Sequence, residues 1–293
     1  MEFGIFGINF GLCADPAVAA EIAEFAEELG FDSLWTGEHV VLPDPQAPPS
    51  PAHPLTPMLH PSTSLAYVAA VTDEIRLGTG ITLVAQRNPV VLAKEMASLD
   101  VLSGGRLMLG IGAGYLAAEF AALGIPFDER GRRTDEAIRV LRELWSSEAP
   151  EFDGEFNRFS GIQSRPRPLR RERTPIHGGG MSNSAYRRAV ASCHGWFGFA
   201  MDLESTAASL DALEEMEAQV ERPDWLGDLE ISITPRETPT VEDVEAYEDL
   251  GVHRLILMLP QADVATATAF MERVADELFD ADDDDDDDDD DED

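Results

Sequence analysis

Short apolar segments alternate with helical patterns eight times along this chain. Three of these segments, Ile75–Ile81, Arg106–Gly112 and Arg254–Pro260, are apolar almost throughout, which is typical of parallel strands buried on both faces. Eight strand-then-helix units favour a closed (β/α)8 barrel over an open doubly wound sheet. The sequence therefore predicts an α/β fold, a TIM barrel of residues 1–279, followed by a disordered poly-acidic tail of residues 280–293.

The predicted elements leave two long irregular stretches. Residues 37–60 hold seven prolines, and long loops of this kind are usually functional or disordered. Residues 148–173 read as an irregular insertion, in which Phe152–Phe159 resembles a hairpin. The predicted strands are 3–9, 31–36, 75–79, 107–111, 176–178, 196–199, 229–234 and 254–259, and the predicted helices are 16–29, 62–71, 89–102, 130–147, 184–192, 203–220, 241–250 and 264–278.

The chain carries no targeting or membrane pattern. Its first ten residues have no basic region, and their apolar run is short and broken by glycines, so they predict a strand and not a signal peptide. No apolar run approaches the roughly 18 residues of a membrane helix. We therefore expect a cytoplasmic protein without a membrane partner. Cys13 and Cys193 form neither a metal pattern nor a disulfide framework.

The charge balance is strongly acidic. The net charge is −36, and the last twelve residues, Asp282–Asp293, are all acidic, which leaves −24 on the rest. Lys94 is the only lysine among 21 basic residues. An acidic, lysine-poor surface suits a salt-rich cytoplasm, where counter-ions screen self-repulsion, so we interpret it as a halophilic composition. It argues against a nucleic-acid partner, which needs a basic surface.

Residues that directly follow the strands line one mouth of such a barrel, where its active sites lie. After the second strand stand Glu38 and His39, the only acid at a strand end that neighbours a histidine. Histidine can donate or accept a proton near neutral pH. The pair is either a catalytic group or a solvated loop pair, and its position at a strand end favours the first.

A glycine-rich segment follows the fifth strand. Gly178, Gly179 and Gly180 precede Met181, Ser182 and Asn183, and a helix begins there. Glycines let the backbone approach an anion, and the start of a helix supplies unpaired N–H groups. The segment is therefore a candidate phosphate site, with a plain tight turn as the alternative.

The segment Gly110–Gly114 is not a dinucleotide fingerprint, because its spacing is G-x-G-x-G and three strand–helix units precede it. Here Gly112 and Gly114 are expected to let a planar ring lie against the backbone. His53 and His60 lie away from any carboxylate cluster, and no HExxH spacing occurs, so we predict no catalytic metal.

At these residues the chain resembles the luciferase-like monooxygenase family, in particular its coenzyme F420-dependent branch. The resemblance runs from about Phe3 to Leu278. Its most specific parts are Ala26–Val40, Ile75–Tyr115, Gly124–Trp145 and Pro175–Ser182.

The resemblance implies a barrel whose mouth holds a flavin-like ring. It implies a non-prolyl cis peptide after Thr79, at Gly80–Ile81, behind that ring. His39 would act at the reacting centre and Glu38 would contact the cofactor. Thr79, Gly80, Ile81, Gly112 and Gly114 would line the ring, and Gly178, Gly179, Gly180, Met181 and Ser182 would hold its phosphate. Arg106 would be structural, at the far mouth.

Two positions depart from the family pattern. Glu38 stands where the family usually has aspartate before the histidine, which puts its geometry at the cofactor in question. His194 stands where the family usually has aspartate in an Asp-Gly-Trp sequence, so another group does that residue's work or the work is lost.

The motifs and the acidic composition favour coenzyme F420 as cofactor, with FMN as the alternative. The leading hypothesis is an F420-dependent oxidoreductase that moves a hydride to or from a small-molecule substrate. The second is an FMN-dependent monooxygenase that uses oxygen and requires a separate flavin reductase. The third is a non-catalytic flavin-binding protein. Family members are often dimers, so a homodimer is expected.

Overall fold

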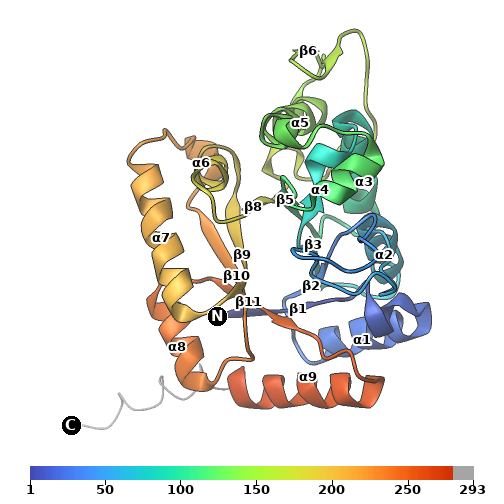
Figure 1. Cartoon of the computed structure of the whole chain (residues 1–293), viewed down its shortest axis with the longest axis vertical. Helices are drawn as coiled ribbons and strands as arrows, with labels where there is room; N and C mark the ends of the chain where they lie inside the picture. The colour runs from blue at the N-terminus through green and yellow to red at the C-terminus, as the bar shows by residue number, and fades with distance from the viewer. Residues whose placement is uncertain (280–293) are drawn as a thin grey trace, which may run out of the picture.

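The computed structural model describes residues 1–279 and shows a closed barrel of parallel strands (Figure 1). Hydrogen bonding runs in the order β3-β2-β1-β11-β10-β9-β8-β5, and β3 also pairs with β5, which closes the ring. The predicted TIM barrel is therefore confirmed. The barrel strands are β1 (Glu2–Phe6), β2 (Ser33–Thr36), β3 (Arg76–Thr79), β5 (Leu107–Gly112), β8 (Ile176–Gly179), β9 (Gly195–Met201), β10 (Glu230–Pro235) and β11 (Arg254–Met258).

Helices surround the barrel on its outside (Figure 1). Within residues 1–279 they are α1 (Pro16–Glu28), α2 (Pro61–Val68), α3 (Pro89–Leu102), α4 (Ala117–Leu123), α5 (Arg130–Ser146), α6 (Asn183–Ser192), α7 (Leu203–Glu217), α8 (Val241–Asp249) and α9 (Val264–Leu278). The predicted bounds of α3 and α9 are confirmed to the residue.

Local chemistry explains why several helices begin where the sequence predicts. Pro16 and Pro89 each occupy the first helical turn, where the missing N–H costs nothing. The side chains before them, Asp15 and Asn88, accept hydrogen bonds from the first free backbone N–H groups, as good N-cap residues do. A helix start of this kind is encoded within three residues, so the sequence alone can predict it.

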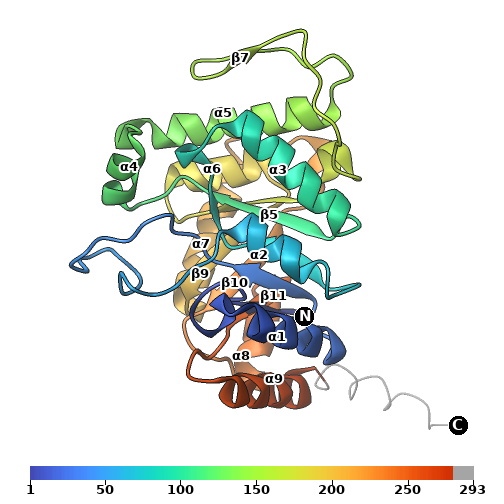
Figure 2. The ribbon, with the colours of Figure 1, turned by 90° about the vertical axis from the view of Figure 1, so that its right-hand side faces the viewer.

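Two elements were not predicted. α4 lies in the loop after β5, and β4 (Thr82–Leu83) pairs with β5 as a continuation of the course of β3. The predicted hairpin is confirmed as the antiparallel pair β6 (Phe152–Asp153) and β7 (Arg158–Phe159), which projects beyond α5 in Figure 2. Residues 280–293, the predicted tail, lie outside the described residues, so its boundary with the barrel domain stays a prediction.

The peptide bond between Gly80 and Ile81 is cis, as the family resemblance implied. It separates β3 from β4 and leaves the Ile81 side chain at the carboxyl end of the strands. Ile81 packs there against an apolar cluster inside the barrel, formed by Phe6, Trp35, Met108, Phe197 and Ile256. The Trp35 and Phe197 rings stack with centroids 5.6 Å apart. The barrel interior is thus filled beneath its mouth, as expected of this fold.

A cluster of ion pairs around Arg254 fills the opposite end of the barrel. The buried guanidinium of Arg254, in β11, donates to Asp32 at 2.6 Å and to Ser232 at 3.1 Å, and it forms ion pairs with Glu2 and Glu230. A buried charge is tolerated only when it is paired in this way. Because this end is plugged, the open end is the one where the strands reach their carboxyl termini.

The loop of residues 37–60 and α4 lie at the open end, on the left of Figure 2, whereas the N-terminus lies on the right. None of the helices within residues 1–279 is long and apolar enough to cross a membrane.

Candidate active site

His39 directly follows β2 at the open mouth of the barrel, and its side chain is only 9% exposed. Its Nε2 lies 3.3 Å from the hydroxyl of Tyr115, which follows β5. Its Nδ1 lies 3.5 Å from a carboxylate oxygen of Glu119, in α4. The imidazole is therefore held from both sides, which is what a group that moves a proton in a fixed direction requires.

Glu119 is the central residue that sequence reasoning missed. It is fully buried, and its Oε1 accepts the backbone N–H groups of Val40 and Val41, directly after His39. Its Oε2 accepts from the Gln86 amide at 2.9 Å. Burial alone would raise the pKa of Glu119, but the nearby His39 imidazole and the hydrogen bonds from Gln86 and Val40 outweigh it and lower the pKa below its usual value. The carboxylate is thus ionised at neutral pH.

The hydroxyl of Tyr115 stays protonated for the opposite reason. Burial raises the pKa of Tyr115, and the negative charge of Glu119 raises it further. The neutral phenol can therefore donate a hydrogen bond to Nε2 of His39. Tyr115 is half exposed, so it stands between the histidine and the solvent of the mouth.

Glu38 faces the protein and not the mouth. Its Oε2 accepts the backbone N–H of Leu83 at 2.6 Å, and its Oε1 forms an ion pair with Arg87. His60 was expected to lie away from carboxylates, but its Nε2 lies 3.7 Å from the same Oε1 and its Nδ1 lies 3.7 Å from Glu95, because the loop folds back onto the barrel. Glu38 is buried, so the longer acid at this position ties the end of β2 to the segment after the cis peptide. A direct contact of Glu38 with a cofactor stays a prediction.

The loop of residues 37–60 is fastened to the barrel by Asn9. The buried Asn9 amide donates to the carbonyls of Gly37, at 2.9 Å, and Leu59, at 2.7 Å, and it accepts the Gly37 N–H. The loop also reaches the histidine, because the backbone N–H of His39 donates to Sδ of Met58. The proline-rich segment is thus ordered against the candidate site at both of its ends.

Large apolar side chains stay exposed around the mouth. Phe199, near the end of β9, packs on Phe6 with ring centroids 5.2 Å apart, and Phe6 in turn lies against Gly80. An exposed apolar rim at the end of a filled barrel is typical of a ligand site. The exposed apolar residues at the mouth are Val40, Val41, Tyr115, Met181, Phe199 and Met258.

The predicted phosphate site is also brought to the mouth. Gly178 and Gly179 are the buried end of β8, whereas Gly180, Met181 and Ser182 are exposed. Gly180 has a φ of +109°, a conformation that favours glycine. Ser182 is the N-cap of α6 and accepts the Ala185 N–H. The first backbone N–H groups of α6 have no partner within the helix, so they are available to an anion.

Two of the predicted glycines lie directly against the Ile81 side chain. A Cβ on Gly112 would lie 2.2 Å from Cδ1 of Ile81, and a Cβ on Gly179 would lie 2.7 Å from the same atom. Both glycines therefore make room for the Ile81 side chain, whereas Gly112 was expected to lie against a ring and Gly179 to hold a phosphate. Gly114 is needed for its φ of +83°. Cofactor contacts of these residues, and of Thr79, whose hydroxyl donates to the Gly110 carbonyl at 2.7 Å, stay predictions.

The off-pattern His194 is explained at the plugged end of the barrel. Its backbone N–H donates to the Ile176 carbonyl at 2.7 Å, and its ring Nδ1 accepts the Ile176 N–H at 3.1 Å. The imidazole supplies a hydrogen-bond acceptor at the start of β8, which a carboxylate could also supply. Arg106 is structural as predicted, because its guanidinium donates to the carbonyls of Ala69, Thr72 and Ile75 after α2.

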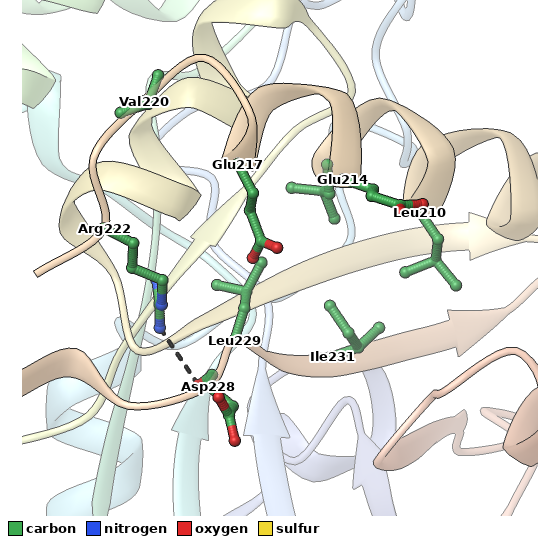
Figure 3. Close-up of a pocket in the computed structure, with 9 residues that line it drawn as sticks. Leu210, Glu214, Glu217, Val220, Arg222, Asp228, Leu229 and Ile231 are labelled. Atoms are coloured by element: carbon green, nitrogen blue, oxygen red, sulfur yellow. Dashed lines mark hydrogen bonds between the residues drawn. The ribbon is translucent and has the colours of Figure 1, made fainter. Parts of the chain in front are cut away.

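A hollow of about 440 Å³ lies between α7 and β10 (Figure 3). It is lined by the end of α7 and the start of β10, including Glu217 and Ile231, and so lies away from the open mouth. Arg222 on its wall already donates to the carbonyls of Val190, Cys193 and Asp228. This guanidinium holds the protein together and is not free for a ligand.

Within residues 1–279, no group of three or more histidine, cysteine, aspartate or glutamate side chains is placed to hold a metal ion.

Comparison with known proteins agrees with this site. A profile described as luciferase-like monooxygenase matches residues 1–291. The chain belongs to the luciferase-like monooxygenase family. The likeness extends to the fold: a solved monooxygenase of this family's fold, RslO1 from Streptomyces bottropensis, superposes with a TM-score of 0.77 at 23% identity, over 95% of this chain and 99% of the other.

Relatives in this family use different cofactors. An uncharacterized protein of Mycobacterium tuberculosis is 28% identical over 95% of this chain and 99% of its own. An F420-dependent glucose-6-phosphate dehydrogenase of Gordonia bronchialis is 30% identical over 90% of this chain and 77% of its own. An FMNH2-dependent dimethylsulfone monooxygenase of Pseudomonas putida is 31% identical over 52% of this chain and 43% of its own. Members of the luciferase-like family are thus oxidoreductases with F420 or with FMN.

Proposed function

We propose that this luciferase-like protein is an F420-dependent oxidoreductase that transfers a hydride between the deazaflavin and a small organic substrate. One observation carries the proposal: His39 is held between Tyr115 and Glu119 at an apolar, open barrel mouth. The choice of F420 is supported by the Gordonia relative, which matches 90% of the chain, whereas the FMNH2-dependent relative matches 52%.

The residues at the mouth fit such a cofactor. The exposed apolar rim that includes Phe199 and Met258 suits the faces of a planar ring. Gly180 and Ser182, at the start of α6, suit its phosphate. Bound F420 supplies a ring carbon that accepts or gives a hydride, and the protein orients and shields it.

The residues of the protein itself transfer the proton that accompanies the hydride. When the substrate loses a hydride from carbon, its hydroxyl must also lose a proton, and a histidine at the mouth can take that proton at Nε2. In the reverse direction the same nitrogen returns it. The loop of residues 37–60, fastened by Asn9 and Met58, lies beside His39 on this side of the mouth.

FMN-dependent oxygenation is the second candidate, supported by the FMNH2-dependent relative. With FMN, the protein would need a separate flavin reductase. In either case we propose a small-molecule substrate, a cytoplasmic location and a homodimer. The acidic composition supports a salt-rich cytoplasm and weighs against a nucleic-acid partner.

The first test is a fluorescence titration of the protein with F420 and, separately, with FMN in molar KCl. Micromolar or tighter binding of F420 alone supports the proposal and justifies a screen of small hydride donors and acceptors. Preference for FMN moves the protein to oxygen-dependent chemistry. Binding of neither overturns the assignment, and tight binding without redox exchange over the whole panel indicates a non-catalytic flavin-binding protein.

The second test is His39→Ala. Loss of a general base typically costs on the order of 10²–10⁴-fold in turnover, whereas the cofactor should bind with nearly unchanged affinity. A variant with equal turnover would contradict the proton-transfer role.

A further inference from the structure

We infer that Glu119 is a positioning residue for His39: its carboxylate keeps the proton of the neutral imidazole on Nδ1, so that Nε2, beside the Tyr115 hydroxyl, is the proton acceptor. The tautomer follows from the free protein alone. Its use in hydride transfer rests on the function proposed above.

The two oxygens of Glu119 have separate partners. Oε1 is taken by the backbone N–H groups of Val40 and Val41. Oε2 accepts from Gln86 at 2.9 Å, and it is the carboxylate oxygen that lies 3.5 Å from Nδ1 of His39, a buried nitrogen with no hydrogen-bond partner within the described residues. An ionised carboxylate has no proton to donate. The nitrogen that faces Oε2 must therefore carry the proton itself if the two groups are to attract each other.

The other side of the ring is complementary. The Tyr115 hydroxyl lies 3.3 Å from Nε2 and is neutral, so it can donate to this nitrogen. The remaining nearby acid, Glu38, is already bonded to Leu83 and Arg87. Glu119 and Tyr115 are thus the titratable groups that contact the ring. The carboxylate favours a proton on Nδ1, and the Tyr115 hydroxyl, which can donate or accept, can then donate to the lone pair on Nε2.

The same carboxylate also sets where the ring lies. By holding the N–H groups of Val40 and Val41, Glu119 fixes the two residues that follow His39 in the chain. α4 therefore controls both the backbone and the protonation of a histidine that stands 80 positions earlier. A buried carboxylate that orients a histidine in this manner determines which ring nitrogen can react.

Glu119→Gln reverses the pattern without changing the shape. The new amide oxygen can still accept from Val40 and Val41, which places the new NH2 group where Oε2 was. That NH2 group donates to Nδ1 of His39 and so moves the ring proton to Nε2. Gln86 can accommodate the change by turning its amide, because its own Oε1 has no hydrogen-bond partner within the described residues.

The decisive measurement is the tautomer of His39 in long-range ¹H–¹⁵N spectra of histidine-labelled protein near pH 8. His39→Ala assigns the signals. We expect the Nδ1–H form in the natural protein and the Nε2–H form in Glu119→Gln. The matched control is Glu136→Gln, because Glu136 is also a buried carboxylate that accepts backbone N–H groups, from residues 155–157, away from the mouth. It should leave the His39 signals unchanged.

An Nε2–H tautomer in the natural protein overturns the inference, and this measurement does not depend on whether any variant folds. An unchanged tautomer in folded Glu119→Gln overturns it as well. In turnover, we expect Glu119→Gln to lose roughly 100-fold or more in kcat, with the F420 dissociation constant within about threefold of the natural value. If the tautomer switches as expected but His39→Ala turns over normally, the positioning role stands and the proposed function fails.

Discussion

At the scale of single residues, Ile81 explains why two neighbouring strand ends at the mouth are rich in glycine. Its side chain follows the cis peptide and fills the space above three glycines from two neighbouring strands: Gly110 and Gly112 in β5 and Gly179 in β8. A glycine-rich strand end predicts a bound ring when it is considered alone. The structure shows that much of this space already belongs to the protein, because core side chains interdigitate closely.

The Ile81 contact predicts different outcomes for two alanine substitutions. At Gly112 the new Cβ would lie 2.2 Å from Cδ1 of Ile81, the far end of a side chain, whereas at Gly110 it would lie 1.9 Å from the Thr79 carbonyl oxygen, part of the backbone. Overpacking typically costs about 1–3 kcal/mol, and more where backbone must move. We expect Gly110→Ala to lower the free energy of unfolding more than Gly112→Ala.

Ile81→Val is the matched second change, because it removes only Cδ1. Combined with Gly112→Ala, it should restore most of the lost free energy of unfolding, as measured by urea unfolding. Combined with Gly110→Ala, it should restore none. Equal rescue of both substitutions would show that Ile81 is not the obstacle.

His39 and Glu119 show the limit of prediction at this scale. The position of His39 after a predicted strand placed it at the mouth, as the structure confirms. Glu119 lies in a short helix after a different strand, and its contact with His39 exists only because β2 and β5 end at the same mouth. The pattern near Glu119 offered only a carboxylate shortly after a strand end as a signal.

At the scale of elements, starts of helices were predicted better than ends of strands. A cap and a first-turn proline act within a few residues, so α1 and α3 begin where the sequence indicates. β1 was predicted to continue to Asn9 but ends at Phe6, because Gly7 directly after it has a φ of +112° and leaves the extended conformation. Asn9 instead holds Gly37 and Leu59. A strand ends where its neighbours stop pairing with it, and the local sequence does not record this.

The cap of α3 leads to a prediction of stability. The Asn88 side chain accepts the backbone N–H groups of Val90, at 2.9 Å, and Val91, at 3.3 Å. Asn88→Ala should lower the free energy of unfolding by about 1 kcal/mol, whereas Asn88→Asp should retain most of it. Urea unfolding with Glu21→Ala, an exposed change within α1, provides the control. A loss equal to that of the control would contradict the capping role.

At the scale of the whole molecule, the net charge of −36 opposes folding by self-repulsion, and salt screens it. We therefore expect the thermal midpoint to rise by at least about 5 °C between 0.1 M and 2 M KCl, since each kcal/mol is worth roughly 2–4 °C in a chain of this size. A variant that lacks residues 282–293 should still show the rise, because −24 of the charge remains. A flat or falling midpoint would contradict the halophilic interpretation.

Buried His177 and partly buried His194 predict the response of the whole fold to acid. Burial lowers the pKa of His177 to about 4, and burial with the nearby Arg142 lowers the pKa of His194 to about 4, from 6.5. Between pH 6.5 and pH 4 the unfolded chain binds more protons than the folded one. The contribution of these histidines to the free energy of unfolding is therefore fully present above pH 6.5 and is lost as the pH drops toward 4. The free energy of unfolding should fall by up to roughly 1.4 kcal/mol per pH unit because of His177, and by less because of the partly exposed His194.

Urea unfolding at pH 7.5, 6.5, 5.5 and 4.5 measures this slope. His194→Asn keeps an acceptor for the Ile176 N–H and removes one titrating group, so its slope between pH 6.5 and 4.5 should be shallower than that of the natural protein. Identical slopes would show that His194 does not contribute to the acid sensitivity.

The sequence by itself determined the barrel, most of its helix starts and the position of His39 at the mouth. Through family resemblance it also indicated the cis Gly80–Ile81 peptide. These features depend on patterns within a few residues or on motifs shared with relatives. Only the tertiary structure decided that Glu38 faces inward, that Ile81 occupies the glycine-lined space, and that Glu119 holds the ring of His39. Each of these is a contact between side chains from different strand–helix units, and closure of the barrel, not the local sequence, determines which units meet.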